Sequence, residues 1–102
     1  MSLDLAILAE DGTPEDTVSL SVNLHHDLIV AADKLGIDQV LRLRDYYGDV
    51  EFRANDLSTL AAQVETLGLS VKKYDLRKFL VDFDKLIIHA AASGKVLYAI
   101  AD

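Results

Sequence analysis

The sequence predicts a single α+β domain spanning residues 1–102, in which a small antiparallel sheet of three strands packs against about four helices. Three observations predict this class. Hydrophobic residues alternate with a period of two near both ends of the chain, and they recur at helical spacing in between. Apolar residues make up 51% of the 102 residues, and no Pro-, Gly- or Ser-rich tract divides them. A chain of this length buries about 60–70% of its unfolded surface, which is sufficient for one core.

The predicted sheet consists of a β-hairpin and a C-terminal strand. Residues 3–10 and 17–22 alternate as strands, and Gly12 and Pro14 predict a turn between them. Leu3, Leu5 and Ile7 share one face of the first strand. The last strand, residues 95–102, is apolar on both faces and is expected to pair with the first. The resulting order is second–first–last, with the helices on one face.

Four helices are predicted between the second and the last strand. Capping residues and glycines predict their limits, namely Asn23, Asp38 and Asn55 or Asp56 at the starts, and Gly36, Gly68 and Gly94 at the ends. The short second helix is expected to end near residues 47–48, and residues 50–53 are expected to be an extended connection. The fourth helix is the longest, and its wide apolar stripe consists of Leu76, Phe79, Leu80, Phe83, Ile87, Ala90 and Ala91.

The charge of the chain restricts its partners. Seventeen acidic and ten basic residues give a formal net charge of −7. Phosphate backbones and anionic membranes repel such a chain, so neither nucleic acid nor a membrane is the expected partner. The same charge favours a basic protein partner through steered association, although it is also typical of a soluble small domain. The absence of cysteine and of a basic leader sequence predicts a cytoplasmic protein.

The sequence contains no recognisable catalytic motif. It lacks a glycine-rich phosphate loop, and its serines lack the surroundings of a nucleophile. We therefore expect a protein that is not an enzyme and needs no cofactor. A metal-dependent enzyme that uses His25, His26, Asp27 and the remote His89 is a weaker alternative, because adjacent helical residues point about 100° apart. One of the two adjacent histidines would have to meet His89 across the fold; otherwise one is exposed and one hydrogen-bonded.

The densest polar and aromatic segment lies in the middle of the chain. Tyrosine and arginine are the residues that most often anchor protein interfaces. The predicted interface consists of Arg42, Arg44, Asp45, Tyr46, Tyr47, Asp49 and Glu51. The alternative is that one tyrosine packs in the core while the charges solvate the loop. A basic cluster, Lys72, Lys73, Arg77 and Lys78, is more typical of a solvated helix start than of a binding site.

The stretch from Leu41 to Phe52 reads Leu-Arg-Leu-Arg-Asp-Tyr-Tyr-Gly-Asp-Val-Glu-Phe. It resembles a recurrent segment of small, uncharacterised bacterial proteins, in which a helix end leads into Asp-Tyr-Tyr, a Gly/Asp turn and an aromatic residue. The likeness extends through the leucine-rich helix that follows to the final helix and strand. Some proteins with this pattern resemble immunity proteins, which bind and neutralise a partner toxin. The resemblance implies a binding protein without catalysis, and it implies no particular functional residue.

These observations favour a non-catalytic protein-binding domain, with an immunity-type inhibitor of a toxin or other protein as its most specific form. The alternative is a homo-oligomeric accessory or structural protein. The apolar content of 51% is high for a lone small domain, and an exposed edge strand or helix face could form a symmetric dimer.

Overall fold

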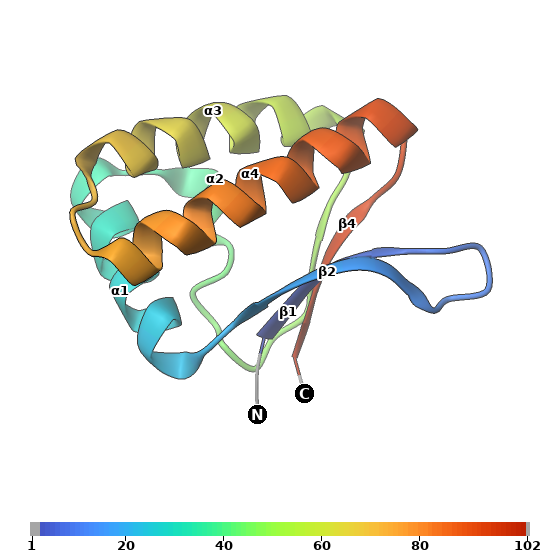
Figure 1. The fold of residues 1–102 in the computed structure, drawn as a ribbon, viewed down its shortest axis with the longest axis horizontal. Coiled ribbons are helices and arrows are strands. Elements are labelled where there is room, and N and C mark those ends of the chain that lie inside the picture. Colours follow the sequence, from blue (N-terminus) through green and yellow to red (C-terminus); the bar gives the residue numbers. More distant parts are fainter. Residues whose placement is uncertain (1–2, 102) are drawn as a thin grey trace.

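A four-stranded antiparallel sheet forms one layer of the molecule, and the helices form a second layer on one of its faces (Figure 1). The computed structural model describes residues 3–101. The elements in chain order are β1 (Leu3–Leu8), β2 (Pro14–Leu20), α1 (Val22–Leu35), α2 (Asp38–Leu41), β3 (Val50–Phe52), α3 (Ala54–Ser70), α4 (Tyr74–Ser93) and β4 (Leu97–Ala101). Among these residues, no helix combines the length and the apolar character that crossing a membrane requires.

The sheet confirms the α+β class and the order β2-β1-β4, but it has four strands and not three. The fourth strand is β3, which pairs antiparallel with β4 at the edge of the sheet, with Phe52 opposite Leu97. The sequence predicts this segment only as an extended connection, because three residues are too few to display an alternation. Burial of Phe52, whose side chain is fully enclosed, holds the segment on the sheet.

The two faces of the sheet differ as the alternation predicts. Leu3, Leu5 and Ile7 of β1 are fully buried under the helices. Residues at the intervening positions, such as Asp4 on β1 and Tyr98 on β4, point to the uncovered face. This one-sided burial is usual in antiparallel sheets, and it places the core between the sheet and the helices. The final strand ends at Ala101; position 102, where the predicted strand ends, lies outside the described residues.

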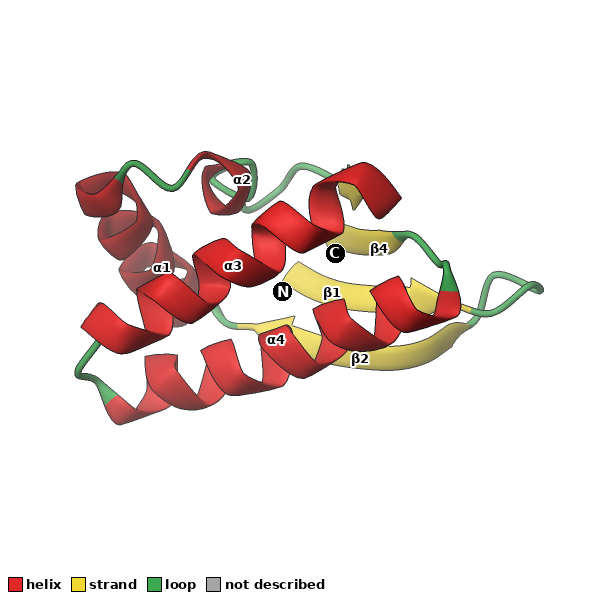
Figure 2. Ribbon diagram, turned by 90° about the horizontal axis from the view of Figure 1, so that it is seen from above, coloured by secondary structure: helices red, strands yellow, loops and turns green. Residues whose placement is uncertain are grey.

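The long helices α3 and α4 lie side by side above the sheet, while α1 and α2 cover one end of it (Figure 2). The apolar stripe predicted for the fourth helix is buried in α4, with Phe83 and Ile87 almost completely enclosed. No other described element covers the opposite side of α4, which faces solvent.

Several helix limits differ from the predicted ones. Ser21, and not Asn23, caps α1, because the Ser21 hydroxyl oxygen accepts a hydrogen bond from the Leu24 amide at 3.3 Å. Strand β2 therefore ends at Leu20. Helix α2 is shorter than predicted and ends at Leu41, and its N-cap is Ile37 rather than Asp38.

Helix α3 differs from its prediction at both ends. It begins after Arg53, and the Asp56 carboxylate accepts a hydrogen bond from the Arg53 amide at 3.3 Å, so Asp56 lies inside the first turn. Gly68 does not end the helix, which continues to Ser70. By contrast, Gly36 and Gly94 adopt positive φ angles of 64° and 65° and end α1 and α4 as predicted.

Candidate protein-binding surface

Residues 42–49 connect α2 to β3, and we call them the α2–β3 loop. Tyr46 anchors this loop to the core. Its hydroxyl donates a hydrogen bond to the Leu20 carbonyl oxygen at 3.0 Å, and its ring meets the His25 ring edge-on at 4.9 Å. Only 8% of Tyr46 is exposed. Tyr46 is therefore the tyrosine that packs in the core, as the alternative interpretation expects, and little of it is accessible to a partner.

His25 holds the start of the same loop. It is buried, and its Nε2 atom lies 2.6 Å from the Leu43 carbonyl oxygen. A carbonyl oxygen only accepts hydrogen bonds, so Nε2 is protonated and donates. His26, the next residue, is exposed. This arrangement agrees with the expectation that one histidine of the pair is hydrogen-bonded and the other is exposed.

The residues of the alternative metal site, which the sequence favours less, do not meet. Asp27 pairs with Lys73 at 3.1 Å, on the side of α1 that faces the start of α4. His89 lies near the other end of α4, where its ring nitrogens are 3.7 Å and 3.4 Å from the carboxylates of Glu15 and Asp16. Within residues 3–101, no group of three or more His, Cys, Asp or Glu side chains could hold a metal ion.

A tight turn fixes the tip of the α2–β3 loop. The Asp45 carboxylate accepts a hydrogen bond from the Tyr47 amide at 3.0 Å, and the Asp45 carbonyl accepts one from the Gly48 amide at 3.1 Å. A Cβ atom at Gly48 would lie 2.9 Å from an Asp45 carboxylate oxygen, so glycine permits this close approach. The Asp49 carboxylate then accepts a hydrogen bond from the Ala101 amide at 2.9 Å and ties the loop to β4.

Tyr47 projects from this fixed turn into solvent. Its side chain is 66% exposed, and its ring rests edge-on against Tyr46, with the ring centroids 5.5 Å apart. Arg44 is also exposed, and its Nε atom donates a hydrogen bond to the Leu41 carbonyl at 3.3 Å. The loop therefore presents an aromatic side chain and an arginine beside two carboxylates, those of Asp45 and Asp49.

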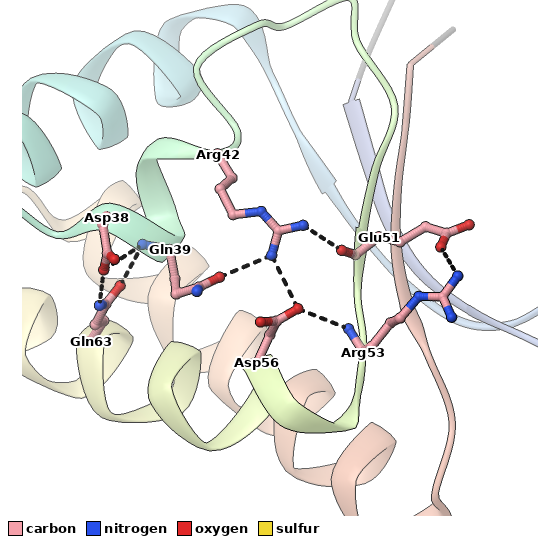
Figure 3. Close-up of polar contacts among 7 residues, drawn as sticks. All are labelled: Asp38, Gln39, Arg42, Glu51, Arg53, Asp56 and Gln63. Carbon is pink, nitrogen blue, oxygen red and sulfur yellow. Dashed lines mark hydrogen bonds and ion pairs between the residues drawn. The ribbon is translucent and has the colours of Figure 1, made fainter.

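Arg42 has a structural role at the base of the loop (Figure 3). Its guanidinium donates hydrogen bonds to the Gln39 side chain at 2.9 Å, to the Asp56 carboxylate at 3.2 Å and to the Glu51 carbonyl at 2.7 Å. The same group lies 4.7 Å from the centroid of the Phe52 ring. Arg42 thus joins α2, β3 and α3, and its bond to Glu51 satisfies a carbonyl on the outer edge of the sheet.

A shallow hollow of about 580 Å³ lies beside the loop. It is lined by Arg42, Asp49, Val50, Glu51, Arg53 and Asp56. Its charges are largely paired within the chain, since Arg53 contacts the Glu51 carboxylate at 2.9 Å and Arg42 contacts Asp56. The hollow is therefore a polar surface with few unpaired charges among its described lining residues.

A second surface, which the motifs of the sequence do not single out, is a groove of about 390 Å³ on the outer side of α3 and α4. It is lined by Val64, Glu65, Gly68, Leu69, Arg77, Leu80, Val81 and Asp84. Burial raises the pKa of the Asp84 carboxyl above its usual value, and the nearby Glu65 raises it further. One Asp84 oxygen is buried without a hydrogen-bond partner among the described residues. The signal in the sequence is the apolar row Tyr74, Val81 and Ile88, spaced by seven residues.

The seven residues predicted to form an interface therefore divide into two groups. Arg42 and Tyr46 hold the fold together, and Glu51 pairs with Arg53 on the outer strand. Arg44, Asp45, Tyr47 and Asp49 share the exposed surface of the α2–β3 loop. Comparison of the chain with protein-family models, with curated proteins and with solved structures finds no match in any of the three.

Proposed function

We propose that this chain is a non-catalytic protein-binding domain, and that its α2–β3 loop docks on a basic protein partner. In the specific form implied by the resemblance of residues 41–52, the partner is a toxin and the complex inhibits it. The proposal needs no chemistry from the chain itself. It requires a surface that is exposed, rigid and complementary in charge to the partner.

The exposed Tyr47 ring is the observation that carries this proposal. Truncating a tyrosine at the centre of an interface to alanine often costs about 2 kcal/mol or more of binding free energy. Tyr47 is supported from behind by the buried Tyr46, and its backbone is held by the Asp45 turn. Little conformational entropy is therefore lost when a partner covers the ring. The ring is thus both exposed and held in place, which are the properties of an interface anchor.

Charge supports the choice of a basic partner. Asp45 and Asp49, two residues before and after Tyr47 in the chain, are both exposed, and the whole chain carries a net charge of −7. Such a field accelerates association with a basic protein and weakens as salt screens it. Arg44 adds a hydrogen-bonding group that can pair with a carboxylate of the partner and fix its orientation.

The test is affinity capture of the tagged chain from an extract of its source, followed by calorimetry with the purified partner. Wild type is compared with Tyr47→Ala and with Leu35→Ala, a control at the end of α1 that is 48% exposed and lies outside the α2–β3 loop. We expect one basic protein in stoichiometric amount. Its dissociation constant should rise about 30-fold with Tyr47→Ala and stay unchanged with Leu35→Ala.

Two results would refute the proposal. One is equal recovery of the partner by wild type and by a folded Tyr47→Ala variant, which would place the contact elsewhere. The other is capture of an acidic protein whose affinity is no higher at low salt than at high salt. This would remove the electrostatic part of the argument. For the toxin form, the purified chain must also inhibit the partner's activity at a one-to-one ratio.

A further inference from the structure

The outer face of α4 carries a row of large apolar side chains that no described element covers. Tyr74, Val81 and Ile88 recur at every seventh position, and they are 77%, 51% and 55% exposed. By helical spacing they lie opposite the buried stripe of α4. Figure 2, which views the molecule from above, shows α4 lying over the sheet with no other described element above it. A seven-residue repeat keeps side chains on one side of a helix, and it is the spacing by which helices pair with one another.

Two opposite charges flank the centre of this row. Arg77 and Asp84 are seven residues apart, which corresponds to about 10 Å along the helix, and Val81 lies close to their midpoint. The Arg77 side chain has no hydrogen bond or ion pair among residues 3–101. The Asp84 carboxyl is partly buried, with one oxygen lacking a partner in the same part of the chain. The two charges do not meet each other within one copy.

This arrangement is self-complementary under two-fold symmetry. When two α4 helices pair antiparallel about an axis through Val81, Tyr74 of each copy lies opposite Ile88 of the other. The position opposite Asp84 of one copy is position 78 of the other, and Arg77 is the neighbouring residue. Symmetric interfaces have this reciprocity, in which residue i meets residue j and j meets i. We propose that two copies of this chain form a symmetric dimer through the outer faces of α3 and α4, with Val81 on the two-fold axis.

Helix α3 contributes a recess and an apolar rim to this surface. Gly68 lies inside the helix, where glycine is less favourable than alanine, and a Cβ atom there would meet nothing within 4 Å. Packing inside one copy therefore does not explain the glycine. Its missing side chain leaves the groove open for a side chain of the second copy. Leu69, which is 91% exposed, lines the groove and would be covered in the dimer.

A second copy fits this face better than a basic partner does. A basic partner would complement Asp84 and Glu65 but would be repelled by Arg77 in the same groove. A second copy complements both Arg77 and Asp84, because it brings both signs in reversed order. The α2–β3 loop lies at the lower edge of the sheet in Figure 1, away from this face, so the dimer and the proposed partner complex do not compete.

The first test is the mass of the chain in solution by sedimentation equilibrium over a wide concentration range. Wild type is expected to be a dimer. Val81→Glu places two like charges on the axis and should raise the dissociation constant of the dimer by about 30-fold or more. Val22→Glu makes the same change at a valine of similar exposure on α1 and should leave the dimer intact. Circular dichroism verifies that both variants are folded.

The second test exchanges the charges. Arg77→Asp and Asp84→Arg should each dissociate the dimer, because each variant brings like charges together across the axis. Mixed in equal amounts, the two variants should form a heterodimer, in which both cross-axis contacts are again between opposite charges. A wild-type chain that is monomeric up to about 1 mM, a dimer that survives Val81→Glu, or failure of the mixture to pair would each overturn the proposal.

Discussion

The Tyr46 hydroxyl donates a hydrogen bond to the Leu20 carbonyl oxygen at 3.0 Å and thereby fastens the α2–β3 loop to the end of β2. Replacing Tyr46 with phenylalanine leaves this buried carbonyl without that donor. We expect the free energy of unfolding to fall by about 1–3 kcal/mol, as for other buried acceptors that lose their partner. Tyr46→Ala also removes the ring and should cost about 3–5 kcal/mol. Urea denaturation followed by circular dichroism measures both, and a Phe variant as stable as wild type would contradict this role.

Arg42 is expected to stabilise the fold more than its position on a polar surface suggests. Its guanidinium serves three acceptors from α2, β3 and α3, so Arg42→Ala should lower the free energy of unfolding by about 1–3 kcal/mol. Arg42→Lys should recover only part of this loss, because one ammonium cannot span the same acceptors. Arg53→Ala is the control, since its exposed pair with Glu51 contributes less than about 1 kcal/mol. Equal losses for Arg42→Ala and Arg53→Ala in urea denaturation would refute the structural role of Arg42.

Replacing glycine with alanine should have opposite effects at two positions. Gly68 lies inside α3 with open space beside it, so Gly68→Ala should stabilise the monomer by about 0.5–1 kcal/mol. Gly36 adopts a φ of 64° at the end of α1, so Gly36→Ala should destabilise the monomer by about 1–2 kcal/mol. Thermal unfolding at low protein concentration compares the two variants. Effects of the same sign at the two positions would contradict this account of the two glycines.

The raised pKa of Asp84 predicts a pH-dependent change in stability. Burial raises the pKa of this carboxyl above 3.8 in the fold, and Glu65 adds to the shift. The folded state therefore binds the proton more tightly than the unfolded state does. The resulting destabilisation is absent below pH 3.8, develops as the pH rises through the folded-state pKa, and is complete above it. Asp84→Asn should therefore stabilise the monomer at pH 7 and have no such effect at pH 3.5.

Thermal unfolding at both pH values, at concentrations where the chain is monomeric, measures this difference. Asp82→Asn is the matched control, because Asp82 is an exposed partner of Lys78 on the same helix. It should show little effect at pH 7. Glu65→Gln should stabilise the monomer in the same direction as Asp84→Asn, since it removes the second cause of the shift. An Asp84→Asn variant that is less stable than wild type at pH 7 would contradict the prediction.

Much of the fold could be predicted from the sequence because long elements carry clear periods. The alternation of residues 3–10 and the stripe of α4 led to the correct class and the correct order β2-β1-β4. Strand β3 was missed because three residues cannot display a period, and because its place depends on burial of Phe52 against distant elements. Helix limits were wrong where a glycine inside a helix, such as Gly68, looks the same in sequence as one that ends a helix.

The candidate binding surface could be predicted only in part. Composition located the Tyr- and Arg-rich segment, but it could not separate Tyr46 from Tyr47, since adjacent residues differ only in which one the fold buries. Likewise it could not show that Arg42 is engaged by acceptors from three different elements. Asp84 was missed because its partial burial depends on the packing of α3 against α4, which leaves no mark in local sequence.

Site-specific photocrosslinking tests the central claim most directly. A photoreactive phenylalanine analogue is placed at position 47, at position 74, or at the exposed control position 59 on α3, and the chain is irradiated in cells of its source. The proposal predicts that position 47 links to one basic protein of a different sequence, that position 74 links to a second copy of this chain, and that position 59 links to neither. If position 47 gives no adduct beyond those of position 59, the α2–β3 loop is not a protein-binding surface.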